Sequence, residues 1–140
     1  MFIGEYTHTV DEKSRLAIPI KFRAELASGA VVTKGLDGCL FLYTLAEWQK
    51  LVEKLNAMPL SQKSARAFSR LILAGAMDVF LDKQGRIVLP KYLLDYASIK
   101  HSVVVTGLFN RLEVWDSETW AKYKEGTEKE SAELAEQLFI

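Results

Sequence analysis

Two short phrases of the sequence, each with an aspartate four residues before an arginine, carry the side chains best suited to bind a ligand. "DEKSR" begins at Asp11 and "DKQGR" begins at Asp82, 71 positions later. A guanidinium group binds phosphate, or pairs with guanine through two parallel hydrogen bonds. An aspartate in a tight turn accepts hydrogen bonds from backbone N–H groups. Arg15 and Arg86 are therefore candidate nucleic-acid contacts, and the aspartates are expected to shape the turns that present them.

The remaining polar residues of the two phrases are Lys13, Lys83 and Gln84, which would add hydrogen bonds at the same turns. A purely structural interpretation also fits, because each aspartate could simply pair with its own arginine and stabilise the turn. Both interpretations stay open at this point. A cationic feature of this size would bind DNA weakly as a single copy, so oligomerisation would have to multiply it.

The elements that position these phrases are themselves repeated. With one residue inserted, "VVTKGLDGCLFLYTLAEW" at 31–48 matches "VVVTGLFNRLEVWDSETW" at 103–120. Each copy predicts a strand, a polar turn, an extended run ending in proline, a short helix, two strands and a second helix. Gly85 suits a turn with positive φ, whereas Ser14 at the matching position weakens that argument. Two copies indicate two half-folds that pack on each other.

The repeat predicts one domain with four parts. They are repeat one (1–57), a linking helix (58–75), repeat two (76–123) and an acidic C-terminal tail (124–140). The linking helix is expected to pack on a sheet, with Lys63, Arg66 and Arg70 facing either solvent or a phosphate group. Gly126 is expected to interrupt the helical pattern of the tail.

The composition indicates a folded globular domain and excludes several kinds of site. The chain has 140 residues, 49% hydrophobic and 26% charged, which is typical of a folded globular domain. Residues 1–112 hold 15 basic and 10 acidic side chains, whereas residues 113–140 hold 3 and 8. One cysteine and two histidines exclude a disulfide framework and a cysteine–histidine zinc cluster. The apolar surroundings of Cys39 favour a core residue over a nucleophile. Without a signal peptide or an apolar membrane span, the protein is expected in the cytosol.

The combination of motifs resembles the MraZ family of bacterial transcriptional regulators, which are encoded at the head of the division and cell-wall gene cluster. The resemblance covers essentially the whole chain. It rests on the two D-x-x-x-R phrases, each followed by an apolar triplet and proline, on the opening "MFIGEYTHTVDEKSRLAIPIKFR" and on "GLDGCLFLYTLAEW". It implies an α+β fold in which two tandem pseudo-symmetric repeats form one AbrB-like swapped-hairpin (double-psi-like) β-barrel with flanking helices.

The resemblance also implies partners. They are double-stranded DNA with short direct repeats near the protein's own promoter, and further copies of the chain in a closed, octamer-like ring. Repression is the expected outcome, with the protein in the cytoplasm and associated with the nucleoid. No cofactor, metal, membrane or small-molecule substrate is expected. Carried over to this sequence, Arg15 and Arg86 become the expected DNA contacts, with Asp11 and Asp82 shaping the turns.

Two other function classes compete with a DNA-binding regulator. The first is a ring-forming interaction protein whose tip arginines bind an acidic protein partner. The second is an enzyme, which ranks far below because the sequence has no phosphate-binding glycine loop, metal-ligand cluster or nucleophile–base pair.

Overall fold

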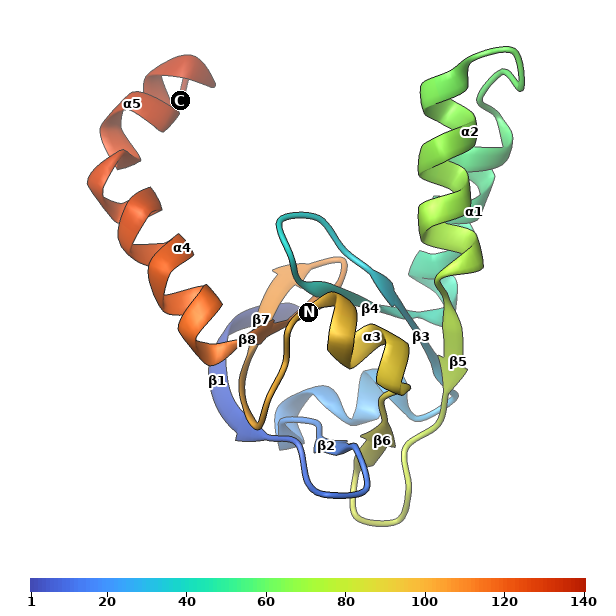
Figure 1. The fold of residues 1–140 in the computed structure, drawn as a ribbon, viewed down its shortest axis with the longest axis vertical. Coiled ribbons are helices and arrows are strands. Elements are labelled where there is room, and N and C mark those ends of the chain that lie inside the picture. Colours follow the sequence, from blue (N-terminus) through green and yellow to red (C-terminus); the bar gives the residue numbers. More distant parts are fainter.

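The computed structural model describes residues 1–140 and shows one order of elements twice (Figure 1). The first copy comprises β1 (Phe2–Thr9), β2 (Arg15–Ala17), η1 (Ile20–Phe22), η2 (Ala24–Leu26), β3 (Ala30–Lys34), β4 (Leu40–Thr44) and α1 (Leu45–Asn56). The second comprises β5 (Met77–Val79), β6 (Arg86–Val88), α3 (Lys91–Tyr96), β7 (Ser102–Phe109), β8 (Leu112–Asp116) and α4 (Ser117–Lys129). Helix α2 (Lys63–Ser69) and the π-helical turn η3 (Arg70–Ala74) join the copies, and α5 (Ser131–Gln137) follows the second.

The strands form two antiparallel sheets. The larger has the order β1-β7-β8-β4-β3-β5, so it contains strands of both copies interleaved, and the smaller pairs β2 with β6. The predicted α+β fold of two tandem repeats is confirmed. The hydrogen-bonded ladders of the larger sheet end at β1 and β5, so closure into a barrel stays a prediction.

The β2–β6 ladder joins the halves because its inward side chains are apolar. Leu16 lies directly opposite Ile87, and the two side chains are 0% and 1% exposed. They belong to a core cluster of 20 buried residues drawn from both repeats. Burying one such side chain stabilises the fold by about 1.5–3 kcal/mol. Separating the two repeats would expose these side chains to water, and that stabilisation would be lost.

Two matching hydrogen bonds connect each hairpin turn to the other repeat. The Ile18 N–H donates to the Gly85 carbonyl at 2.9 Å, and the Leu89 N–H donates to the Ser14 carbonyl at 2.8 Å. Each turn is thus hydrogen-bonded to the residue that directly follows the short strand of the other repeat. The two hairpins form one structural unit.

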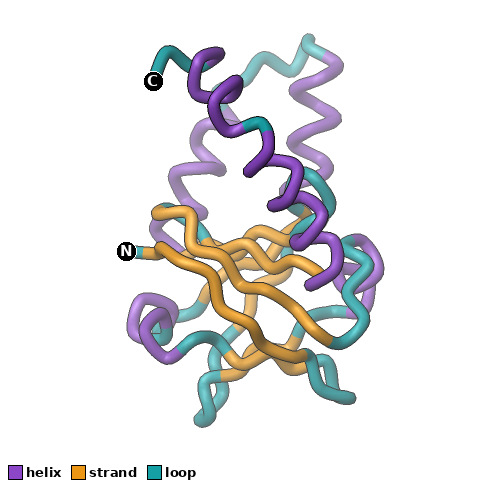
Figure 2. Tube along the Cα trace, turned by 90° about the vertical axis from the view of Figure 1, so that its left-hand side faces the viewer, coloured by secondary structure: helices purple, strands orange, loops and turns teal.

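Two helical arms extend from the body at the end opposite the hairpin turns (Figures 1 and 2). Helices α1 and α2 form one arm, and α4 with α5 forms the other. Thr44 and Glu47 have the spacing of a capping box, and at the start of α1 the Thr44 hydroxyl accepts a 3.1 Å hydrogen bond from the Glu47 N–H. No helix is both long enough and apolar enough to cross a membrane.

Two helix predictions are wrong in part. The linking helix was expected on a sheet, but α2 lies beside α1, and Leu55 and Ala65 line one pocket between them. Only η3 reaches the sheet, where the Ile72 carbonyl accepts a 2.6 Å hydrogen bond from Thr33 Oγ1. Gly126 does not interrupt α4, which continues to Lys129, because one glycine costs a helix only about 1 kcal/mol.

Candidate functional site

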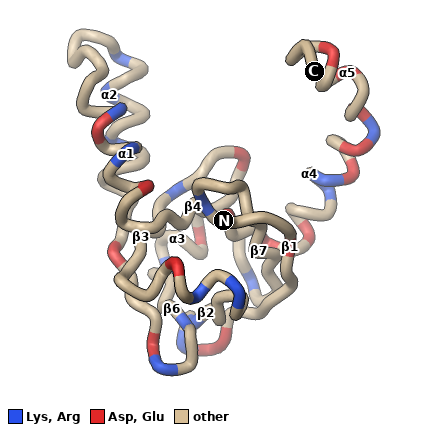
Figure 3. Tube along the Cα trace, turned by 180° about the vertical axis from the view of Figure 1, so that it is seen from behind, with Lys and Arg blue, Asp and Glu red and all other residues tan.

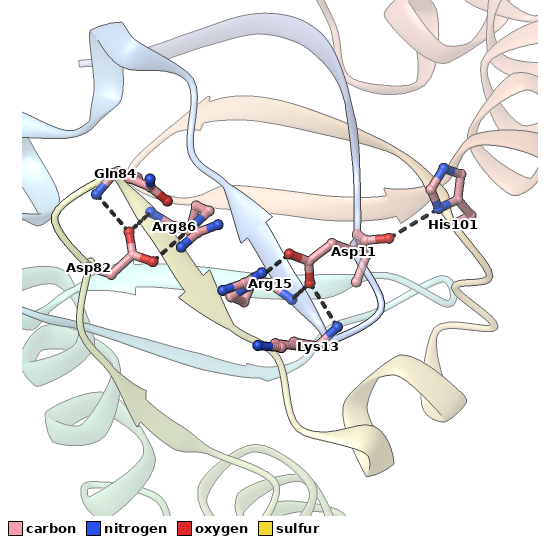
Figure 4. Close-up of polar contacts among 8 residues, drawn as sticks. Asp11, Lys13, Arg15, Asp82, Gln84, Arg86 and His101 are labelled. Atoms are coloured by element: carbon pink, nitrogen blue, oxygen red, sulfur yellow. Dashed lines mark hydrogen bonds and ion pairs between the residues drawn. The ribbon is translucent and has the colours of Figure 1, made fainter.

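The first hairpin turn is organised by one carboxylate. Asp11 Oδ1 accepts the backbone N–H groups of Lys13 and Arg15, each at 2.9 Å, and Asp11 Oδ2 accepts Arg15 Nε at 2.7 Å (Figure 4). The Ser14 N–H donates to the Asp11 carbonyl at 2.9 Å and closes the turn. The motif spacing is therefore explained, since the side chain at the first position reaches the third and fifth residues of the turn.

The second turn has the same arrangement. Asp82 Oδ1 accepts the N–H groups of Gln84 and Arg86 at 2.9 Å, and Oδ2 accepts Arg86 Nε at 2.8 Å. The Gly85 N–H donates to the Asp82 carbonyl at 3.0 Å. The polar geometry of the two turns is thus the same to within 0.1 Å for these side-chain bonds, although their central residues differ.

These hydrogen bonds hold both carboxylates in the charged form. The backbone N–H of Arg15 is the main cause that lowers the pKa of Asp11, and the Arg15 side chain adds to it. The backbone N–H of Arg86 lowers the pKa of Asp82 in the same way. Both groups are ionised at neutral pH, so each aspartate remains a permanent anchor for its arginine.

Each anchored arginine keeps most of its donors free. Arg15 and Arg86 use Nε for the aspartate, while their terminal nitrogens Nη1 and Nη2 have no hydrogen-bond partner in the chain. Their side chains are 29% and 28% exposed. A guanidinium fixed at Nε keeps its two terminal NH₂ groups for other acceptors, and such a pair of donors suits phosphate oxygens or the acceptor edge of guanine.

The register of the β2–β6 ladder places both arginines on one face. Arg15 lies opposite Val88, and Ala17 lies opposite Arg86, with one inward-facing pair between them. Opposed residues of an antiparallel pair point to the same side, and alternate residues share that side. The two arginines are therefore diagonal neighbours on the outer face, and the 57% exposed Val88 lies on the same face.

The other predicted site residues lie at the same end of the molecule. The side chains of Lys13, Lys83 and Gln84 are exposed and make no hydrogen bond or ion pair within the chain. Figure 3 shows charged residues of both signs along the turns beside β2 and β6. The three cations of the linking segment lie instead in the first arm, away from the turns, and the Arg66 Nη1 there donates to the Leu60 carbonyl at 2.9 Å.

One arginine at the second turn was not predicted from the sequence. Arg23 Nε donates to the Ile18 carbonyl at 2.8 Å. A Cβ atom added to Gly85 would lie 2.3 Å from Arg23 Nε, so the guanidinium packs directly over this buried glycine. Motif spacing could not find Arg23, because the matching position of repeat two is Leu94, and the contact exists only through the exchange of hairpins.

The single cysteine is a core residue. Cys39 is 0% exposed, as predicted, and burial raises the pKa of its thiol to about 12. A protonated, buried thiol is a poor nucleophile. No group of three or more histidine, cysteine, aspartate or glutamate side chains lies close enough together to hold a metal ion.

Comparison with known proteins matches the tandem architecture. A family model described as "MraZ protein, putative antitoxin-like" matches the chain twice, over residues 1–71 and residues 72–139. The chain is 48% identical over 138 residues to a protein of Caldanaerobacter subterraneus named Transcriptional regulator MraZ, covering 99% of this chain and 96% of that protein. Proteins with the same name from Clostridium acetobutylicum and Herpetosiphon aurantiacus are 50% and 51% identical, over 91% and 99% of this chain and 89% and 96% of theirs.

Proposed function

The chain belongs to the MraZ family, and from that premise we propose that it is a sequence-specific DNA-binding transcriptional regulator. Its DNA interface is the outer face of the β2–β6 ladder together with the two adjoining turns. Arg15 and Arg86 make the principal contacts, Lys13, Lys83 and Gln84 add further hydrogen bonds, and the two motif aspartates orient the arginines.

One observation carries this proposal. Two guanidinium groups, one from each repeat, are fixed at Nε by ionised carboxylates and lie on the same outer face with their terminal nitrogens unpaired. A purely structural role needs only the Asp–Arg pair and gives no reason for two forks to share one exposed face. Fixing the side chain before binding also lowers the conformational entropy lost when DNA is contacted.

The protein acts as an assembly in this proposal. One chain presents too few cations for tight binding at physiological salt, so several copies in a closed, octamer-like ring would read several direct repeats at once. The helical arms support this arrangement, because they extend away from the hairpin turns and carry apolar side chains that are more than two thirds exposed: Leu60, Leu138, Phe139 and Ile140. Contacts between arms would leave the arginine face free.

The biological role follows from the family. The DNA is the protein's own promoter region, at the head of the division and cell-wall gene cluster, and the outcome is repression. The site of action is the nucleoid in the cytoplasm. A catalytic role is not proposed, because the curated relatives are named as regulators and the single cysteine is buried.

The test is a fluorescence-anisotropy titration with the chain's own upstream DNA and a scrambled duplex, across a series of salt concentrations. The variant is Arg15→Ala/Arg86→Ala. Its matched control is Lys50→Ala/Lys129→Ala, which removes the same charge from exposed side chains on the two arms. Light scattering reports whether each variant still assembles.

We expect the wild type and the arm control to prefer the upstream DNA, and the arginine variant to lose that preference while it still assembles. Equal binding of the two duplexes by the wild type, or unchanged binding by the arginine variant, would overturn the proposal. Loss of assembly in Arg15→Ala would favour the alternative, in which the arginines serve protein contacts.

A further inference from the structure

The two turns share one polar geometry but differ in charge. Glu12 of the first turn corresponds to Lys83 of the second, and Lys13 corresponds to Gln84. Counting Asp and Arg as well, the first turn has two acidic and two basic side chains, whereas the second has one acidic and two basic. An anion that approaches the outer face shared by the two arginines therefore meets a more positive electrostatic potential near the second turn than near the first.

Arg23 increases this inequality. It belongs to repeat one, but the exchange of hairpins places its guanidinium over Gly85 in the second turn. Its Nε donates to the Ile18 carbonyl, and its terminal nitrogens have no hydrogen-bond partner in the chain. Arg23 is thus fixed at Nε with two NH₂ groups unused, as the motif arginines are, but by a neutral carbonyl instead of a carboxylate.

The anchor of Arg23 leaves its positive charge uncompensated. Glu25, two residues further along the chain, pairs with the N-terminal amine at 2.6 Å. No carboxylate lies within ion-pair distance of Arg23, in contrast to Arg15 and Arg86. The full charge of Arg23 is therefore available to an external anion.

We propose that Arg23 is a third arginine of the DNA interface, a phosphate ligand that joins Lys83 and Arg86 and makes the second turn the principal anchor for the DNA backbone. This inference rests on the proposed function. It follows that one protomer binds its site in a single orientation, because the face that carries two equivalent arginine forks has only one cation-rich end.

The first experiment compares Arg23→Gln with Lys21→Gln on upstream DNA across the salt series. Lys21 is a matched control, since it is an exposed cation two residues away whose ammonium group lies over the rings of Tyr6 and Phe22. Loss of one phosphate contact lowers the magnitude of the negative slope of log K against log salt by about 0.9. We expect that decrease in Arg23→Gln, a wild-type slope in Arg23→Lys, and no change in Lys21→Gln.

A second pair of variants leaves the Arg23 contact with Gly85 intact, in case Arg23→Gln impairs folding. Lys83→Gln and Lys13→Gln each remove one exposed lysine, one from each turn. Lys83→Gln should weaken binding to upstream DNA by more than Lys13→Gln does. Equal or larger loss in Lys13→Gln, or a folded Arg23→Gln with the wild-type slope, would overturn the inference.

The arginine double variant distinguishes failure of the proposed function from failure of the Arg23 inference. If Arg15→Ala/Arg86→Ala abolishes the preference for upstream DNA while Arg23→Gln keeps the wild-type slope, the proposed function stands and the role of Arg23 is refuted. If the double variant binds as the wild type does, both fail together.

Discussion

Ser14 and Gly85 occupy equivalent positions of the two turns and adopt the same left-handed backbone conformation, with φ of 61° and 77°. The serine adopts the same turn as the glycine, although a serine at this position makes a turn with positive φ harder to predict from sequence. A non-glycine residue in this region costs roughly 1–2 kcal/mol, partly offset by the greater chain entropy of an unfolded glycine. Ser14→Gly should therefore stabilise the fold by about 0.5–1 kcal/mol in equilibrium urea denaturation at fixed protein concentration.

The reciprocal change should have the opposite sign. Gly85→Ala places a methyl group 2.3 Å from Arg23 Nε, so the guanidinium must move and its hydrogen bond to Ile18 is lost. With the strain of positive φ added, we expect a loss of about 2 kcal/mol or more. A Ser14→Gly variant no more stable than wild type would mean that the serine turn carries no strain.

The local features of the fold were accessible from sequence because they depend on neighbouring residues. The repeat, the hairpin turns and the Thr44 cap follow from spacing alone. The pairing of β2 with β6 joins segments about 70 residues apart, and it was expected only through the family resemblance. The amphipathic pattern of the linking segment shows one apolar face, but that pattern does not say whether a sheet or α1 covers it.

The candidate site likewise combines local contacts, which the sequence predicts, with contacts that depend on tertiary structure. Asp11 to Arg15 and Asp82 to Arg86 are local contacts that the motif spacing predicts. Arg23 lies outside both motifs, and its contact with Gly85 depends on the tertiary exchange of hairpins. The shared outer face of the two arginines likewise depends on the register between β2 and β6.

Neutralising the motif aspartates should reduce specificity more than affinity. In Asp11→Asn/Asp82→Asn the amide oxygens can still accept the turn N–H groups, but the ionic anchors at Arg15 and Arg86 Nε are lost. Removing two negative charges also increases the general attraction to DNA. We expect the ratio of upstream to scrambled affinity to fall, with binding of the scrambled duplex equal to or tighter than in wild type, as measured by anisotropy.

His8 should make the fold sensitive to mild acid. Burial, followed by the charge of Arg23, lowers the pKa of His8 below its ordinary value of 6.5. Between the folded and unfolded pKa values the unfolded chain binds more protons, so stability falls as pH drops below about 6.5. The free energy of unfolding should decrease over this window in wild type and less so in His8→Gln. Identical pH profiles of the two proteins would contradict the assignment.

Two buried threonines of the larger sheet, one in β7 and one in β3, should respond oppositely to the same substitution. Thr106 Oγ1 is buried without a hydrogen-bond partner, whereas Thr33 Oγ1 donates to the Ile72 carbonyl at 2.6 Å. Valine has nearly the shape of threonine, so the hydroxyl is the main difference. Thr106→Val should stabilise the fold by about 1 kcal/mol, because an unpaired buried polar group is removed.

Thr33→Val is the control for that change. It removes a made hydrogen bond between β3 and η3, so it should destabilise the fold by about 1–2 kcal/mol. Both values come from urea denaturation at the same protein concentration, since assembly would otherwise shift the apparent stability. The opposite signs separate hydrogen bonding from a general preference for valine in strands, because such a preference would raise the stability of both variants.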